Sequence, residues 1–207
     1  MDKNLCVIFA AGDFVGDFVK KENHFVIAAD AGFHHLEKLN ISPDILLGDF
    51  DTIKYIPKEI ETISFPPEKD YTDSELAILE GISRGYKSFI IYGALGGKRL
   101  EHTLSNIKLC EYYTIKGYDI TLSDGNNIVK CIHNSFLEFD EDNKGFISLF
   151  SLDGKANGVS IKGLKYELCD TDLSKGNPTL CVSNEFIGKK AKISVKDGTI
   201  TIIYQRK

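Results

Sequence analysis

The sequence predicts an α/β domain that is followed by an all-β domain, and two observations support this fold class. Three runs in the first half, 5–10, 25–29 and 89–94, are almost continuously apolar. Such runs are typical of parallel strands that helices cover on both faces. From about residue 126 the apolar runs become short and alternate with turn residues, as in a sandwich or a barrel.

Strands and helices are expected to alternate in the first half. The predicted strands are 4–10, 25–30, 45–48, 88–94 and 119–123, and the predicted helices are 31–40, 72–85 and 102–116. The second helix has the clearest start, because Thr72 and Glu75 form a T-x-x-E capping box. Leu76, Leu79 and Ile82 then recur on one face, as in an amphipathic helix.

The second half is expected to contain strands and no helix. The predicted strands are 128–133, 136–139, 145–152, 158–161, 179–182, 192–195 and 199–204. Lys196-Asp197-Gly198 is predicted to join the last two as a hairpin. The joint between the halves is placed at 124–127, which gives an α/β domain over 1–124 and an all-β domain over 125–207.

Composition and charge argue against several classes of protein, among them nucleic-acid-binding and membrane proteins. The chain has 207 residues, of which 43% are hydrophobic and 27% are charged, and its formal net charge is -5. No basic run provides the footprint that nucleic-acid binding needs. No apolar stretch reaches spanning length and no signal peptide is evident, so we expect a soluble, cytoplasmic protein without membrane contact. Five cysteines without a C-x-x-C pair favour neither a disulfide scaffold nor a zinc site.

Two carboxylates stand directly after a predicted strand. Asp49 and Asp51 follow 45–48, and ligands of open α/β sheets gather at the carboxyl ends of strands. Carboxylates at this spacing can share one Mg²⁺, and Gly48 lets the backbone bend there. The alternative from these residues alone is a polar turn with helix N-cap character.

A second acidic cluster leads into the predicted helix 72–85. Here Glu75 is best explained as part of the helix cap. Asp70 and Asp73 differ from it, because four carboxylates on adjacent loops repel one another unless a cation or a basic partner lies among them. Asp30 also ends a predicted strand, where it can cap the next helix or line a nucleotide cleft.

The loop before the third predicted helix combines glycines with basic side chains. Gly96 and Gly97 free the backbone to wrap a phosphate, and the helix start supplies N–H donors. The Arg99 guanidinium can bind phosphate oxygens in a bidentate way, beside Lys98. His102 can donate to a phosphate, or it can be a surface or capping residue. Together with the acidic clusters, the loop indicates an enzyme that acts on a nucleotide.

In combination, these motifs resemble the thiamine pyrophosphokinase family. That family carries G-D-F-D-S, then D-x-T-D-x-E, then a Gly-Gly-x-Arg loop that ends in Asp-His, and an S-N-E-F-like stretch near the C-terminus. The chain has, in the same order, Gly48-Asp49-Phe50-Asp51-Thr52, Asp70-Tyr71-Thr72-Asp73-Ser74-Glu75, Gly96-Gly97-Lys98-Arg99-Leu100-Glu101-His102-Thr103-Leu104-Ser105-Asn106 and Ser183-Asn184-Glu185-Phe186. Pro43-Asp44, ahead of the first motif, also fits.

Two positions depart from the family pattern. Thr52 replaces the usual Ser and keeps the hydroxyl, whereas Glu101 replaces the usual Asp and lengthens the arm. If Glu101 only orients Arg99, the change is tolerable, but direct contact with the ligand would change the nucleotide preference. Tyr166 stands where many relatives have Trp, and its ring can pack on thiamine or in the core.

The resemblance implies a fold, a reaction and an assembly. The fold is an N-terminal Rossmann-like parallel α/β domain that binds nucleotide and Mg²⁺, followed by a C-terminal antiparallel β-sandwich that binds thiamine and dimerises. The reaction transfers the pyrophosphoryl group of ATP to the hydroxyl of thiamine and gives thiamine diphosphate and AMP. The family acts as a homodimer, with each active site between the α/β domain of one subunit and the β domain of the other.

The resemblance also implies how the residues divide the work. The Mg²⁺ ligands are Asp49, Asp51 and Asp73. The ATP-binding residues are Asp30, Gly96, Gly97, Lys98, Arg99 and His102. The thiamine residues are Asp73, Tyr166, Ser183 and Asn184, although a plain β-turn explains Ser183 and Asn184 equally well. The catalytic residues are Asp49, Asp51, Asp70, Asp73 and Arg99, with Asp70 or Asp73 acting on the thiamine hydroxyl.

Two other functions stay open. One is a Mg²⁺-dependent phosphatase of the haloacid-dehalogenase type, because Asp49-Phe50-Asp51 after an apolar strand resembles its D-x-D motif. Ile53 stands where that class has Thr or Val, and no later D-D motif is evident. The other is a non-catalytic sensor of nucleotide or thiamine, and the four carboxylates together with Arg99 argue against it.

Overall fold

The computed structural model describes residues 4–51, 53, 55–66, 68, 70–173 and 179–205. The chain divides into two compact units, Met1–Leu109 with Gly117–Gly125 and Cys110–Lys116 with Asn126–Lys207. Thr52, one of the two departures from the family pattern, lies outside the described residues. Within the described part of the chain, none of the helices combines the length and the hydrophobicity that crossing a membrane requires.

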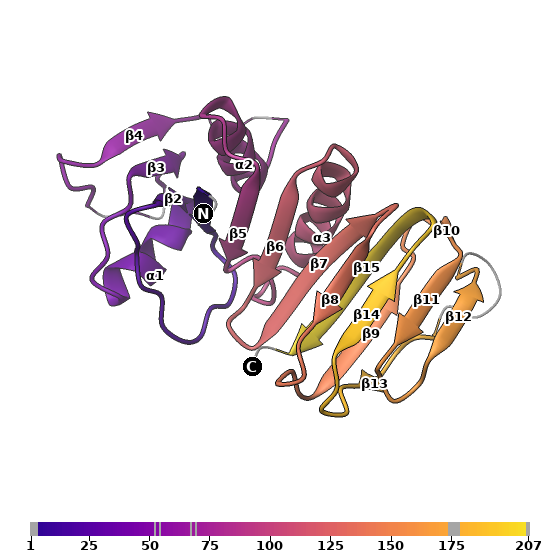
Figure 1. Cartoon of the computed structure of the whole chain (residues 1–207). Helices are drawn as coiled ribbons and strands as arrows, with labels where there is room; N and C mark the ends of the chain where they lie inside the picture. The colour runs from indigo at the N-terminus through magenta and orange to yellow at the C-terminus, as the bar shows by residue number, and fades with distance from the viewer. Residues whose placement is uncertain are drawn as a thin grey trace. The chain divides into compact units, whose positions relative to one another are not determined.

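A parallel sheet forms the centre of the first unit (Figure 1). Its strands lie in the order β6-β5-β1-β2-β3-β4, and every neighbouring pair is parallel. The bounds are β1 Leu5–Phe9, β2 His24–Ala29, β3 Ile45–Gly48, β4 Glu61–Ser64, β5 Ser88–Tyr92 and β6 Asp119–Ser123. The predicted α/β character is confirmed, with all five predicted strands present. β4 was not predicted, because its mostly exposed residues show no apolar pattern.

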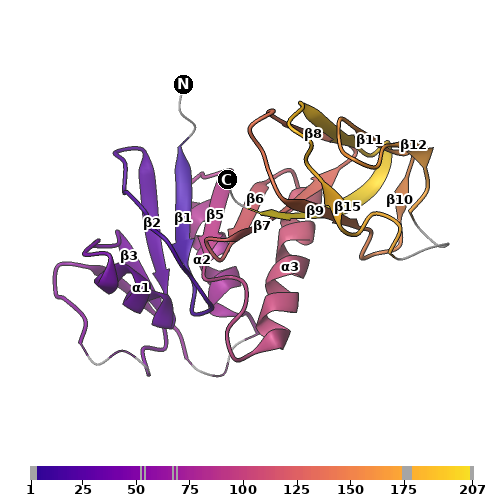
Figure 2. The ribbon, with the colours of Figure 1, turned by 90° about the horizontal axis from the view of Figure 1, so that it is seen from below.

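Helices cover both faces of this sheet. The α-helices are α1 Phe33–Lys38, which follows a 3₁₀ turn at Asp30–Gly32, α2 Asp73–Ser83 and α3 Leu100–Ile115. Helix α1 lies against this sheet (Figure 2). Phe33 and Leu36 of α1 share a hydrophobic core with Val7 of β1. Gly81 of α2 packs against Cys6, whose side chain points to the opposite face of β1. This double cover explains why β1 is almost completely buried.

Helix α2 begins as predicted but packs through an unexpected face. Thr72 is its N-cap, and the Thr72 hydroxyl accepts a hydrogen bond from the backbone N–H of Glu75 at 3.2 Å. The buried residues of the helix are Ser74, Ala77, Ile78 and Gly81. The predicted face is wrong, since Leu79 is 37% exposed. The small residues allow the helix to approach the sheet closely, and hydrophobicity alone does not reveal them.

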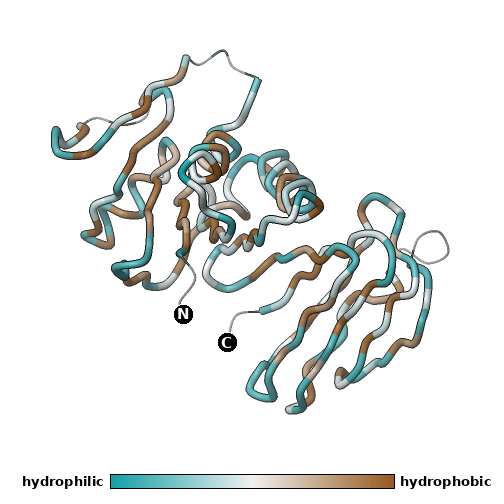
Figure 3. Tube along the Cα trace, turned by 45° about the horizontal axis from the view of Figure 1, so that its top comes forward, coloured by the Kyte–Doolittle hydropathy of each residue, from teal (hydrophilic) through white to brown (hydrophobic). Residues whose placement is uncertain are grey.

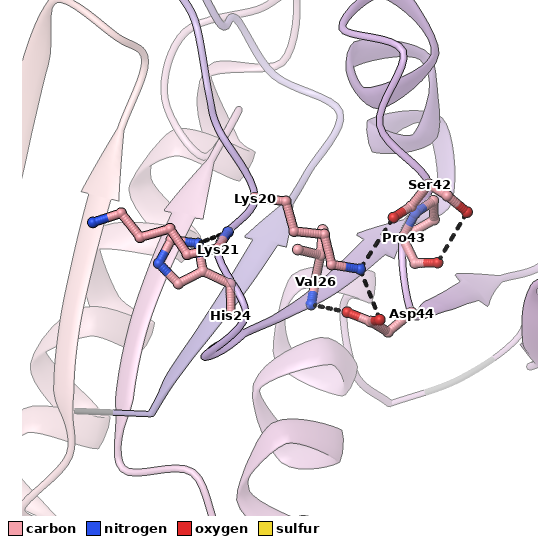
Figure 4. Close-up of polar contacts among 7 residues, drawn as sticks. All are labelled: Lys20, Lys21, His24, Val26, Ser42, Pro43 and Asp44. Carbon is pink, nitrogen blue, oxygen red and sulfur yellow. Dashed lines mark hydrogen bonds and ion pairs between the residues drawn. The ribbon is translucent and has the colours of Figure 1, made fainter. Parts of the chain in front are cut away.

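Asp44 fixes the start of β3 (Figure 4). Its carboxylate accepts a hydrogen bond from the backbone N–H of Val26 at 2.7 Å and pairs with Lys20 Nζ at 2.7 Å. The backbone N–H of Asp44 donates in turn to the Val26 carbonyl. Pro43-Asp44 therefore has a structural role, in which it aligns β3 with β2.

The second unit contains two antiparallel sheets. One has the order β13-β9-β15-β7 with β10 beside β15, and the other has the order β12-β11-β14-β8. The bounds are β7 Asn127–His133, β8 Phe136–Phe139, β9 Phe146–Phe150, β10 Ala156–Asn157, β11 Val159–Lys162, β12 Leu168–Thr171, β13 Asn184–Glu185, β14 Ala191–Ser194 and β15 Asp197–Gln205. Ile202 of the first sheet and Ile193 of the second belong to one hydrophobic core. The predicted all-β character is confirmed in the described residues from 126 onward.

Two predictions for the second unit are wrong. Residues 179–182 form a turn instead of a strand, and the Val182 N–H donates to the Thr179 carbonyl at 3.1 Å. Lys196-Asp197-Gly198 does not close a hairpin, because β14 pairs with β8 and β11 whereas β15 pairs with β7, β9 and β10. The chain changes sheets at this point, and an alternating pattern is the same in either sheet.

Hydrophobic residues follow the strands of each unit, and hydrophilic residues gather in the connections (Figure 3).

The five cysteines are free thiols, and only Cys169 is exposed. Burial raises the pKa of the Cys6 thiol to about 12. The buried thiols therefore behave as small apolar core residues.

Candidate active site

Three carboxylates converge at the C-terminal edge of the parallel sheet. One oxygen atom each from Asp30, Asp49 and Asp51 lies within 4.8 Å of the others. Asp30 follows β2, while Asp49 and Asp51 follow β3, and these two strands are neighbours. The carboxyl ends of adjacent parallel strands bring such residues together. Asp30, which the resemblance assigns to ATP, thus joins two predicted metal ligands.

Gly48 and Phe50 shape the turn that carries two of these carboxylates. Gly48 has a φ of +149°, and a Cβ there would lie only 3.0 Å from the Asp30 Cβ. Phe50 has a φ of +62°, which is uncommon for a residue with a side chain, and its ring packs on the hydrophobic core that includes α1. The packed ring anchors the turn, in which Asp49 is half-buried and Asp51 is exposed.

The electrostatics of this cluster suit a cation. Burial raises the pKa of Asp30, and the charges of Asp73, Asp49 and Asp51 raise it further. Asp73 is the first residue of α2 and is not one of the three converging carboxylates, but its charge reaches Asp30. An all-oxygen set of this kind is what a hard divalent cation prefers.

A pocket of about 190 Å³ contains the residues predicted for ATP. All six of them line it, namely Asp30, Gly96, Gly97, Lys98, Arg99 and His102. Asp73, a predicted ligand of Mg²⁺, lines the same pocket. Negative and positive side chains therefore share one cavity in the first unit.

Arg99 is held by the neighbouring carboxylate. Arg99 Nε donates to Glu101 Oε1 at 2.8 Å, and both side chains are largely exposed. This hydrogen bond lowers the pKa of the Glu101 carboxyl. In this structure Glu101 orients the Arg99 guanidinium. This is the role in which Glu101 can replace the usual Asp of the family.

Several pocket residues had no predicted role, although Thr103 and Asn106 belong to the motif that begins at Gly96. Asn106 is buried, and its Nδ2 donates to the Ala94 carbonyl at 2.8 Å. The Thr103 hydroxyl donates to the Gly96 carbonyl at 3.2 Å. Both lie on α3 at one-turn spacing from each other, so a polar stripe on the predicted helix was the available signal. Gly12, in the loop that follows the buried β1, also lines the pocket.

Asp70 is not brought into this site. Its side chain is exposed, and it does not line the 190 Å³ pocket in the described part of the chain. Asp73 does line that pocket. Of the two candidates for acting on the thiamine hydroxyl, Asp73 therefore lies beside the residues predicted for ATP and Asp70 does not.

The predicted thiamine residues of the second unit form a separate group. Tyr166 is 61% exposed and lines a pocket of about 240 Å³ together with Asn184. Asn184 is buried, and its Oδ1 accepts hydrogen bonds from the backbone N–H groups of Tyr166 and Glu185. Its Nδ2 donates to the Tyr166 carbonyl at 2.7 Å. Asn184 thus holds the backbone of Tyr166, while Ser183 is an exposed turn residue with a φ of +59°.

Comparisons with known proteins show which family the chain is similar to. A family model described as thiamin pyrophosphokinase, catalytic domain, matches residues 17–122, and one described as thiamin pyrophosphokinase, vitamin B1 binding domain, matches residues 136–200. A thiamine pyrophosphokinase of Bacillus subtilis is 29% identical over 189 residues, which is 88% of this chain and 87% of that protein.

Solved structures show the same similarity. The structure of thiamine pyrophosphokinase from Bacillus subtilis matches with a TM-score of 0.86 and 25% identity, and the match covers 98% of this chain and 99% of that one. A thiamin pyrophosphokinase family protein from Enterococcus faecalis matches with a TM-score of 0.79 and 26% identity over the whole of both chains.

Proposed function

Because the chain belongs to the thiamine pyrophosphokinase family, we propose that its carboxylate cluster and its glycine loop bind Mg²⁺ and ATP for the reaction of that family. The reaction transfers the pyrophosphoryl group of ATP to the hydroxyl of thiamine and yields thiamine diphosphate and AMP. One observation carries the proposal: Asp30 of the carboxylate cluster and Asp73 line a single pocket together with Lys98 and Arg99.

The residues present fit a magnesium ion. Asp49 and Asp51, with Asp73 as the third predicted ligand, would hold it, and Asp30 is near enough to the first two to contribute. The raised pKa of Asp30 supports this assignment, because a nearby cation relieves the repulsion among the carboxylates. When bound, Mg²⁺ neutralises charge on the polyphosphate.

The glycine loop supplies the contacts for the polyphosphate. Arg99 offers a planar guanidinium and Lys98 offers an ammonium group, both exposed at the pocket. Gly96 and Gly97 let the chain approach a phosphate closely. His102 in the first turn of α3 is a further donor. Phosphoryl transfer depends mainly on such positioning and charge neutralisation.

Asp73 is the better candidate for orienting or deprotonating the thiamine hydroxyl. It lines the pocket together with Asp30, whereas the exposed Asp70 does not. A general base must reach the proton that it removes, either directly or through one water. Asp73 would therefore join the metal site to the acceptor.

The second unit would bind thiamine and form the dimer. Tyr166 offers an exposed aromatic face for the thiamine rings, and Asn184 supports its backbone. We assign a Rossmann-like domain to 1–124 and a β-sandwich to 125–207, and the core that the two antiparallel sheets share supports the second assignment. We also propose that the protein is a cytoplasmic homodimer. Each active site would combine the first unit of one copy with the second unit of the other.

The direct test is an assay with ATP, thiamine and Mg²⁺ in which AMP is measured. Asp51→Asn and Asp73→Asn should each lower turnover by about 100-fold or more, since each removes a charge from the metal site. Asp17→Asn, at an exposed carboxylate in the loop after β1, is the matched control and should keep wild-type turnover.

Each other outcome has a defined meaning. Wild-type turnover in both cluster variants would end the metal assignment. Phosphate release without thiamine would favour the phosphatase, and binding of ATP without AMP formation would favour the sensor.

A further inference from the structure

The loop after β1 is fixed to the pocket by its own backbone. Four of its N–H groups donate to carbonyls of other segments: Ala10 to Tyr92 at 2.8 Å, Gly12 to Gly93 at 2.7 Å, Asp13 to Leu95 at 2.9 Å and Val15 to Asp124 at 2.8 Å. These bonds tie the loop to the segment that leads into the glycine loop and to the segment after β6. The loop conformation therefore does not depend on the Asp13 side chain.

A histidine and an aromatic ring support the same loop. His35 Nε2 lies 2.9 Å from the Gly12 carbonyl oxygen in a hydrogen bond. The Phe14 ring packs edge-on against His35 with ring centroids 5.7 Å apart. Helix α1 thus buttresses the loop, which makes it a firm base for the residue between Gly12 and Phe14.

That residue, Asp13, contacts the glycine loop. Its Oδ2 accepts a hydrogen bond from the backbone N–H of Gly97 at 2.7 Å. Gly96 and Gly97 have φ values of +68° and +79°, so both adopt left-handed conformations. A Cβ at Gly96 would collide with the Asp13 carboxylate, which shows how closely the two segments pack.

We propose that Asp13 is a positioning residue for ATP, acting through the glycine loop. Its carboxylate fixes the two left-handed glycines, and this fixes the direction in which Lys98 and Arg99 enter the pocket. Asp13 does not itself line the pocket among the described residues, whereas Gly97, Lys98 and Arg99 do. The inference rests on the proposed function for the identity of the ligand, but not for the geometry of the loop.

Two substitutions of Asp13 can separate the effect of its hydrogen bond to Gly97 from the effect of its negative charge. A negative charge near a polyphosphate opposes binding, so any benefit must come from the hydrogen bond to Gly97. Asn keeps an oxygen acceptor of similar reach and removes the charge, whereas Ala removes both. The pair of variants therefore distinguishes the two effects.

The test measures steady-state kinetics with ATP, thiamine and Mg²⁺. Asp13→Ala should raise KM for ATP about tenfold, the effect of losing one well-placed hydrogen bond, while kcat and KM for thiamine change less than about twofold. Asp13→Asn should restore KM for ATP to within about twofold of wild type. Asp17→Ala, at the exposed carboxylate of the same loop, should match wild type.

Amide hydrogen exchange at Gly97 gives a readout that needs no turnover. Exchange should accelerate about tenfold in Asp13→Ala and stay slow in Asp13→Asn, with thermal melts to check that both variants are folded. An unchanged KM for ATP and unchanged exchange in Asp13→Ala would overturn the proposal. So would an Asn variant that behaves like Ala, or tighter ATP binding in either one, which would make Asp13 a competitor of phosphate.

If the wild-type protein forms no AMP, the proposed function fails. The exchange experiment then still decides whether Asp13 fixes the loop.

Discussion

At Asp30, the stability of the fold and the proposed binding of a metal ion make opposite demands. Its carboxylate is partly buried and faces the charges of Asp73, Asp49 and Asp51, so its pKa is raised in the metal-free protein. A raised carboxyl pKa means that the folded state binds protons more tightly than the unfolded chain. Stability is then lost as the pH rises from the unfolded pKa through the folded pKa, and the cost is fully present at a pH above both.

We therefore expect Asp30→Asn to stabilise the metal-free protein. Asn tolerates the φ of +46° at this position and removes the charge. Thermal unfolding in EDTA should show a melting temperature higher by about 2 °C or more. Added Mg²⁺ should raise the melting temperature of the wild type more than that of the variant.

Asp17→Asn is the control for Asp30→Asn, because it makes the same charge change at an exposed site. It should leave the melting temperature in EDTA unchanged. A lower melting temperature for Asp30→Asn in EDTA would show that the cluster is not under repulsion.

Residue types and order were sufficient to predict the glycine loop and Asp30 as parts of one site, but not Gly12, Thr103 or Asn106. Asp49 and Asp51 are close in sequence, so their pairing could be predicted. Asp30 joins them only because β2 lies beside β3, and strand order cannot be read from a local pattern. The hydrogen bonds of Asn184 to Tyr166 depend in the same way on a contact between distant segments.

Helix α2 shows how small residues decide the packing of an element. A Cβ at Gly81 would lie 2.5 Å from the Phe89 ring and 2.9 Å from Cys6 Sγ. Gly85, just beyond the helix, has a φ of +88°, and a Cβ there would meet no atom of the described residues within 4 Å. The two glycines are therefore required for different reasons, one steric and one conformational.

Gly81→Ala should destabilise the protein although Ala favours helices. The propensity gain of about 1 kcal/mol is outweighed by overpacking, which typically costs about 1–3 kcal/mol. Urea unfolding measures the net change in the free energy of unfolding. Gly85→Ala, the comparison, should lose about 1 kcal/mol through its left-handed backbone alone.

A Gly81→Ala variant that is more stable than wild type would mean that the helix can move away from the sheet without cost. In that case Cys6 and Phe89 would not define the packing distance.

The alternating predictions for β14 and β15 show the same limit of sequence patterns, because periodicity identifies a strand but not the sheet that it joins.

At the scale of the whole molecule, the proposed function requires residues from both units. The carboxylates and the basic loop belong to the first unit, and Tyr166 belongs to the second. In the proposed function, a homodimer would complete each active site with the second unit of the partner copy. Such an arrangement is isologous, so each dimer would contain two equivalent sites.

Mixed dimers test this arrangement. Asp51→Asn disables the first unit and Tyr166→Ala weakens the second, so each variant alone should have little activity. Co-expressed with different tags and purified through both, the heterodimer should regain about half of wild-type activity, because one of its two sites combines two intact units. If each site were instead formed within one copy, no intact site would arise and activity would stay at the level of the single variants. Sedimentation at assay concentrations establishes that the species measured is a dimer.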